Sequence, residues 1–208
     1  IQTFAAKQAL RCMEQDPDKS FSKLLDWVDK FDTANLYQVQ RKALRAVLEH
    51  PENNWYQLAR KVFQLDAGVR ETFLQNFILN ASLIGGARQQ AVRLQERCNV
   101  PWAILLDATS ARTGCRAAQH GDPLSLGPDE IDRIVQQGKS LGIYIYIYTG
   151  GEPLMRKEDR IRLCELHSDC EFLAFTDGTG IDEAFCQDML RVKNFVPAIS
   201  LEGFEQAN

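Results

Sequence analysis

Residues 143–153 read IYIYIYTGGEP and carry the clearest structural signal in the chain. Three isoleucines alternate with three tyrosines, and a period of two places neighbouring side chains on opposite faces of a β-strand. We therefore predict a strand over 143–148 with one face toward helices and the other toward the interior of a barrel. The pattern stops at Gly150 and Gly151, where two residues without side chains favour a tight turn or the close approach of a ligand.

The remainder of the C-terminal half alternates short apolar segments with helical patterns. We predict strands over 102–106, 143–148, 172–175 and 196–201, separated by helices over 125–141, 157–167 and 181–192. Strands that alternate with helices are typical of right-handed crossovers in a parallel sheet. A doubly wound sheet and a barrel both satisfy this pattern, and in both the functional residues gather at the carboxyl ends of the strands.

The N-terminal half, residues 1–98, has helical spacing throughout. Apolar stripes at intervals of three and four residues run over 21–31, 36–48 and 55–62, the last through Trp55 and Leu58. A further helix is predicted over 69–84, ending at the Gly85-Gly86 pair. We thus predict a helical region over 1–98 and an α/β domain over 99–208. The helical region could shield the strand ends, cap the opposite end of the sheet, or dock a partner.

Composition excludes several classes of protein. The chain has 208 residues, a net charge of −4 and a pI near 5.5, so it offers no basic field for nucleic acid or an anionic membrane. No apolar run approaches the roughly 20 residues that cross a bilayer. Six cysteines without a secretion signal indicate a reducing compartment, and we expect a cytoplasmic protein.

Polar segments follow each predicted strand. They read DATSARTGCRAAQHG from residue 107, TGGEP from 149, TDGTG from 176 and SLEGFE from 200. Because the carboxyl ends of parallel strands lie at one edge of a sheet, we expect one site there, in which Glu152 accepts a hydrogen bond from a cation such as an ammonium. Taken alone, the Gly-Gly-Glu-Pro turn is equally compatible with a plain tight turn.

Three segments together resemble the core of a radical S-adenosylmethionine (radical SAM) enzyme, from a bacterial subgroup with a helical N-terminal segment. They are PWAILLDATSA (101–111), GIYIYIYTGGEPLMRKEDRIRLCELHSDCEFLAFTDGT (142–179) and RVKNFVPAISLEGFE (191–205). The resemblance implies an α/β fold, a partial TIM-like barrel of six strands. It also implies a [4Fe–4S] cluster that reductively cleaves SAM to a 5′-deoxyadenosyl radical for hydrogen abstraction.

The resemblance assigns roles to polar residues of the strand-end segments. The glycine-rich turn matches the element that contacts the SAM amino group, with a proline that fixes its exit. Two residues after the third strand line the site, two after the fourth face the SAM carboxylate or ribose, and one cysteine matches the third cluster thiolate. In that order they are Gly150, Gly151, Glu152 and Pro153; Thr176 and Asp177; Ser200 and Glu202; and Cys115. The substrate is unspecified, and the implied reductant is of the flavodoxin or ferredoxin type.

The chain departs from this family at the cluster loop. The family spacing is Cys-x3-Cys-x2-Cys, whereas the simplest alignment here lacks the first cysteine and places Arg112 at the second. Only about four of the six strands are present, so we expect a fragment with impaired catalysis, and its status as an enzyme stays open. The alternatives are a non-catalytic relic that binds SAM, or an unrelated α/β fragment.

No other cysteine is expected to replace the missing ligands. Cys98 precedes the first strand, and Cys164 and Cys170 flank the turn before the third, all at the end of the sheet opposite the proposed site. Cys164, His167 and Cys170 have a spacing that could suggest zinc, but they supply no fourth ligand, so buried structural thiols are the better interpretation.

Overall fold

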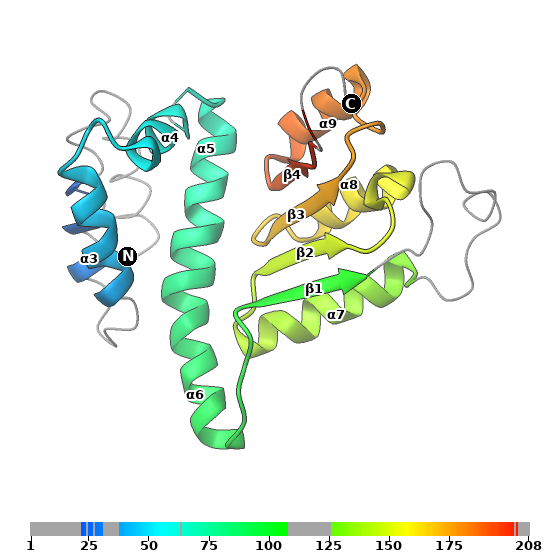
Figure 1. Ribbon diagram of the computed structural model, residues 1–208. Coiled ribbons are helices and arrows are strands. Elements are labelled where there is room, and N and C mark those ends of the chain that lie inside the picture. Colours follow the sequence, from blue (N-terminus) through cyan, green and yellow to red (C-terminus); the bar gives the residue numbers. More distant parts are fainter. Residues whose placement is uncertain are drawn as a thin grey trace.

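The computed structural model describes residues 22–23, 25–26, 28–30, 38–62, 64–107, 126–201 and 203. Figure 1 shows helices in the N-terminal part and a parallel sheet with helices in the C-terminal part. No helix of this described part is long and apolar enough to span a membrane.

The N-terminal elements are α3 (Gln38–Leu48), α4 (Asn54–Val62), α5 (Ala67–Leu74), the π-helix η1 (Gln75–Gly85) and α6 (Gly86–Glu96). The C-terminal elements are β1 (Ala103–Asp107), α7 (Pro128–Leu141), β2 (Ile145–Thr149), the 3-10 helix η3 (Pro153–Arg156), α8 (Lys157–Leu166), β3 (Glu171–Thr176), α9 (Glu183–Val192) and β4 (Phe195–Ile199).

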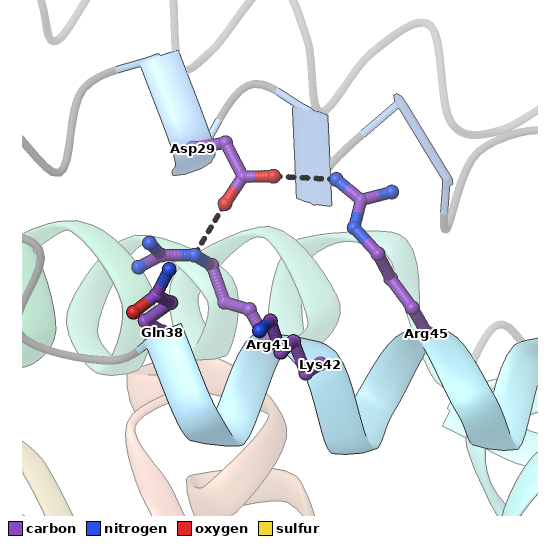
Figure 2. Close-up of a pocket in the computed structure, with 5 residues that line it drawn as sticks. All are labelled: Asp29, Gln38, Arg41, Lys42 and Arg45. Carbon is purple, nitrogen blue, oxygen red and sulfur yellow. Dashed lines mark hydrogen bonds and ion pairs between the residues drawn. The ribbon is translucent and has the colours of Figure 1, made fainter.

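Helix α3 is joined to the preceding segment by ion pairs. Asp29 forms ion pairs with Arg41 and, at 2.5 Å, with Nη2 of Arg45 (Figure 2).

The apolar stripe predicted for the next helix is wrong about which side chains are buried. Trp55 is 69% exposed and Leu58 is 53% exposed, whereas Tyr56 of the same helix α4 is 4% exposed. The helix therefore packs through a face that spacing alone did not select.

Helices α5, η1 and α6 form one continuous rod. Asp66 caps its first turn, because its carboxylate accepts hydrogen bonds from the backbone of Gly68 at 2.9 Å and of Val69 at 3.1 Å. The predicted end at Gly85-Gly86 is wrong, since both glycines keep right-handed helical backbone angles and the helix runs on to Glu96. A Cβ on Gly85 would lie 2.3 Å from the carbonyl oxygen of Gly142, so this glycine permits close packing.

The rod covers the amino-terminal ends of the strands, which is one of the three roles left open by the sequence. Asn76 donates from Nδ2 to the carbonyl of Cys170 at 2.9 Å, and Asn80 donates to that of Asp169 at 2.9 Å. Gln89 donates to the carbonyl of Gly142 at 2.7 Å. These carbonyls belong to the turns that enter β3 and β2, and in Figure 1 the strand arrows point away from the rod.

The sheet is parallel, with the strands in the order β1-β2-β3-β4. Tyr146 pairs with Ile104 on one side and Phe172 on the other, and Phe172 pairs with Phe195. The predicted α/β class and parallel sheet are confirmed. The strands and helices predicted for the C-terminal half are all present, although β2 begins two residues later than predicted and β3 extends one residue further at each end.

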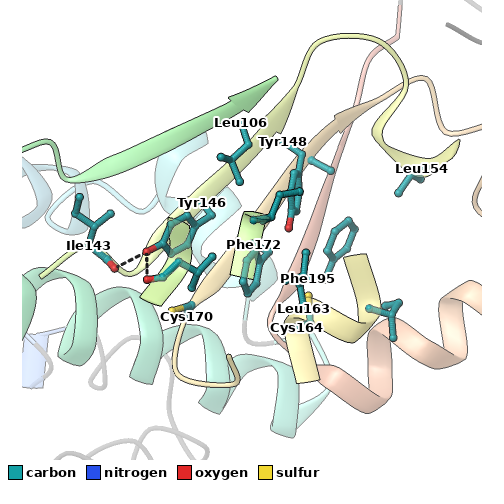
Figure 3. Packing of buried hydrophobic residues seen from close by; sticks show 14 of the residues in the cluster. Leu106, Ile143, Tyr146, Tyr148, Leu154, Leu163, Cys164, Cys170, Phe172 and Phe195 are labelled. Carbon is teal, nitrogen blue, oxygen red and sulfur yellow. Dashed lines mark hydrogen bonds between the residues drawn. The ribbon is translucent and has the colours of Figure 1, made fainter. Parts of the chain in front are cut away.

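One face of the sheet packs on α7, α8 and α9 to form the core (Figure 3). Tyr146 and Tyr148 both point into this layer and stack against Phe172, with ring centroids 5.7 and 6.0 Å apart. The buried hydroxyl of Tyr146 donates to the carbonyls of Val135 and Ile143, each at 3.0 Å. The predicted alternation is thus confirmed, with these tyrosines on the helix side of β2.

The opposite face of the sheet is partly open. Leu105 is 66% exposed and Phe175 is 52% exposed, while Ile147 and Leu173 between them are half-buried. Parallel strands are usually covered on both faces. The described residues thus form a sheet that is covered by three helices on one side and by the rod at its base.

Candidate site at the carboxyl ends of the strands

The turn after β2 contains a left-handed glycine, Gly150, and a buried carboxylate, Glu152. Gly150 has a φ of +98°, a left-handed conformation that favours glycine. Two residues later, Glu152 caps η3, because its Oε1 accepts a hydrogen bond from the backbone N–H of Leu154 at 2.9 Å. The Glu152 side chain is buried, at 5% exposure, and does not extend into solvent.

The same carboxylate joins the end of β2 to the end of β3. The hydroxyl of Thr176 donates to Oε1 of Glu152 at 2.7 Å, and the backbone N–H of Asp177 donates to Oε2 at 2.9 Å. A carboxylate offers about four lone-pair positions, and three of them are used here. The described residues therefore leave one acceptor position of Glu152 unfilled, on Oε2.

The turn after β3 is fixed by its own hydrogen bonds. Gly178 has a φ of +81°, and its N–H donates to the hydroxyl oxygen of Thr176 at 3.0 Å. Asp177 accepts from both the backbone and the hydroxyl of Thr179, at 2.8 and 2.7 Å. The N–H of Ser200 donates to the carbonyl of Thr176 at 2.9 Å, which brings the end of β4 to the same place.

The structure brings most of the predicted site residues to one end of the sheet. They come from the last residue of β3 and from the segments that follow β2, β3 and β4, and are Gly150, Gly151, Glu152, Pro153, Thr176, Asp177 and Ser200. Cys115 and Glu202 lie outside the described residues. The prediction that Glu152 contacts an ammonium stays a prediction, and the structure adds a role in holding two strand ends together.

The other described cysteines do not join this site. Cys164 and Cys170 are buried near the start of β3, and burial raises the pKa of both thiols. Asn194 donates from Nδ2 to the carbonyls of Cys164, His167 and Cys170, at 3.1, 3.1 and 3.0 Å. In the part of the chain that the structure describes, no three His, Cys, Asp or Glu side chains are grouped to hold a metal ion. Both thiols are buried, as the sequence predicted.

No family model, curated protein or solved structure matches this chain. At the strand ends, two left-handed glycine turns, at Gly150 and Gly178, lie beside the buried carboxylate of Glu152.

Sequence reasoning missed one buried cation close to this site. The guanidinium of Arg160 lies 4.4 Å from the ring centroid of Tyr148 and is fully buried between α8 and β2. None of its nitrogens has a hydrogen-bond partner among the described residues, and burial lowers its pKa. The helical stripe of α8 gave a weak signal, since Arg160 lies one residue before the buried Ile161 and four before the buried Cys164.

Proposed function

We propose that this chain is a cytoplasmic protein of the radical SAM type that binds S-adenosylmethionine at the carboxyl ends of β2, β3 and β4. The observation that carries the proposal is the position of Glu152, which lies in the Gly-Gly-Glu-Pro turn and is hydrogen-bonded to Thr176 and Asp177 of the next strand end. The sequential strand order supports a partial TIM-like barrel, in which ligands bind at this edge.

The residues of the turns have distinct parts in this proposal. The backbone of Gly150 and Gly151 and the remaining acceptor position of Glu152 would hold the methionyl ammonium of SAM. Asp177 adds negative charge beside the cationic ligand. Ser200, whose backbone N–H donates to the carbonyl of Thr176 at 2.9 Å, would contact the carboxylate or ribose of SAM.

The residues of this chain do not fit a [4Fe–4S] cluster. Such a cluster is held by cysteine thiolates, and the loop after β1 offers Cys115 where the family has three cysteines. Cys164 and Cys170 lie at the rod-covered end of the sheet and are held there by Asn76 and Asn194. We therefore propose SAM binding without reductive cleavage for the chain as its sequence stands. Only a chain with a complete cluster loop would use the substrate and the flavodoxin or ferredoxin reductant that the family resemblance implies.

Equilibrium dialysis against labelled SAM tests the proposal. The wild-type chain should bind one equivalent, and Gly151→Val should weaken binding at least about tenfold because a side chain obstructs the approach to the turn. Ala184→Val adds a similar side chain on the exposed face of α9 and should leave binding unchanged. Absence of saturable binding by a folded wild-type chain would refute the proposal.

Anaerobic reconstitution with iron and sulfide tests the statement about the cluster. The wild-type chain should take up far less than four irons per chain, and a variant with a restored Cys-x3-Cys-x2-Cys loop should take up more. Stoichiometric uptake of four irons by the wild type would contradict it. Unchanged SAM binding by both forms would separate ligand binding from cluster assembly.

A further inference from the structure

A cavity of about 430 Å³ lies against α3, far along the chain from the strand-end site (Figure 2). The described residues that line it are Asp29, Gln38, Arg41, Lys42 and Arg45. Four of these residues occupy positions 38, 41, 42 and 45 of one helix, a spacing of three, four and seven that places them on the same face. The volume lies within the range of small-molecule sites.

The wall of this cavity is positively charged. Arg41, Lys42 and Arg45 contribute three positive charges against the single negative charge of Asp29, which leaves an excess of two. Asp26 also contacts Arg45, at 2.8 Å, and lowers the excess to one. The pKa of Asp29 is lowered, chiefly by its hydrogen bond from Arg45, so this carboxylate stays ionised. The charge of this cavity wall is thus opposite in sign to the net charge of the chain, which is −4.

The donors of the cavity are of two kinds. The guanidinium groups of Arg41 and Arg45 are held by Asp29, and Arg41 is buried at 7% exposure, so the arginines are fixed in place. The ammonium of Lys42 and the amide of Gln38 make no hydrogen bond or ion pair with any other described side chain. They line the cavity as donors that the described residues do not use.

We propose that this cavity binds the phosphate group of a small molecule, with Lys42 and Gln38 as direct donors and with Arg41 and Arg45 supplying the positive field. A phosphate carries more negative charge and more acceptor oxygens than a carboxylate, which matches several donors on one wall. Asp29 limits the field, so that the cavity takes a small anion and not the extended backbone of a nucleic acid. The proposal is independent of SAM binding, because the two sites share no residue.

Phosphorus NMR titration of inorganic phosphate into the full chain, at constant ionic strength, tests this site. Lys42→Gln should weaken binding about tenfold, since it removes a charge-assisted hydrogen bond. Lys61→Gln removes the same charge from the exposed last turn of α4 and should leave the affinity unchanged. Co-sedimentation with vesicles containing phosphatidic acid then asks whether the phosphate belongs to a lipid.

The results for the two variants distinguish specific binding at the cavity from non-specific binding to surface charges. Binding to free phosphate or to the vesicles that is lost in Lys42→Gln and kept in Lys61→Gln supports the site and identifies the source of the phosphate. No saturable binding in either arm, or equal weakening by both substitutions, overturns it. Unfolding curves of the two variants establish that each chain is folded, and neither residue is buried.

Discussion

Thr176 donates its hydroxyl proton to Glu152 across 2.7 Å, although the two residues are 24 positions apart in the chain. The bond joins the turn after β2 to the last residue of β3, and both side chains are almost completely buried. The hydroxyl oxygen of Thr176 also accepts from Gly178, so a single side chain positions both turns. The shape of the proposed SAM site therefore depends on this pair.

The coupling between these two residues can be measured with a double-mutant cycle. Thr176→Val removes the hydroxyl donor to Glu152 and the acceptor for the N–H of Gly178, so we expect the free energy of unfolding to fall by about 1–3 kcal/mol. Glu152→Gln places an amide group against the N–H of Asp177 and should cost a similar amount. Urea unfolding of both single variants and the double variant should give a coupling energy of about 0.5–3 kcal/mol, whereas simple additivity would show that the bond is not formed.

A substitution at Arg160 tests the sign of the change in unfolding free energy. Arg160→Met removes a buried charge that lacks a hydrogen-bond partner among the described residues and keeps most of the side chain volume. Loss of the contact with Tyr148 costs up to about 2 kcal/mol, but relief of a desolvated charge is larger, so we expect a net gain of about 1–2 kcal/mol in unfolding free energy. The exposed Arg162→Met should change the stability by less than about 0.5 kcal/mol. A large destabilisation by Arg160→Met would indicate an acceptor for this cation.

Glu171 should make stability depend on pH. Burial at the contact between η1 and β3 raises the pKa of Glu171 from 4.5 to about 8, partly offset by a hydrogen bond from Asn76. Between these values the folded chain keeps a proton that the unfolded chain releases. The contribution of Glu171 to the free energy of unfolding is therefore fully present below pH 4.5 and is lost as the pH rises to about 8.

The variant Glu171→Gln isolates this effect. Urea midpoints measured between pH 5 and pH 8 should fall less steeply for Glu171→Gln than for the wild type, because the amide does not titrate. Glu158→Gln, an exposed position on α8, should follow the wild-type slope. Identical slopes for all three chains would show that Glu171 ionises normally in the folded state.

Gly85 tests the contact between the rod and the base of the sheet. Alanine favours a helix over glycine by about 1 kcal/mol, so Gly85→Ala would stabilise the chain if only helix propensity mattered. A Cβ at this position would lie 2.3 Å from the carbonyl oxygen of Gly142, and we expect the clash to win, with a net loss of about 1–3 kcal/mol in urea unfolding. The exposed Ala87→Gly measures propensity alone. A gain in stability for Gly85→Ala would contradict the packing.

The sheet could be predicted from the sequence because its signals are local. The alternation in 143–148 has a period of two that only a strand satisfies, and the helical segments between the strands are long enough for crossovers. The gathering of Glu152, Thr176 and Ser200 followed from the rule that parallel strands end at one edge. The bond between Glu152 and Thr176 did not, since no pattern in the sequence relates side chains 24 residues apart.

The helical half was harder to predict for a different reason. A pair of glycines such as 85 and 86 often ends a helix, but here the tight contact with Gly142 favours a residue without a side chain at position 85 inside the rod. Trp55 and Leu58 have the spacing of a buried stripe, although the structure buries Tyr56. The buried charges of Arg160 and Glu171 were also missed, because burial depends on neighbours supplied by distant segments.

Amide exchange in the presence of SAM tests the central claim most directly. If SAM binds at the carboxyl ends of the strands, hydrogen exchange should slow at the backbone of Gly150, Gly151, Asp177 and Gly178, with no change along α3 and α4. Exchange that stays unchanged at saturating SAM, or that slows only away from these turns, would contradict the account.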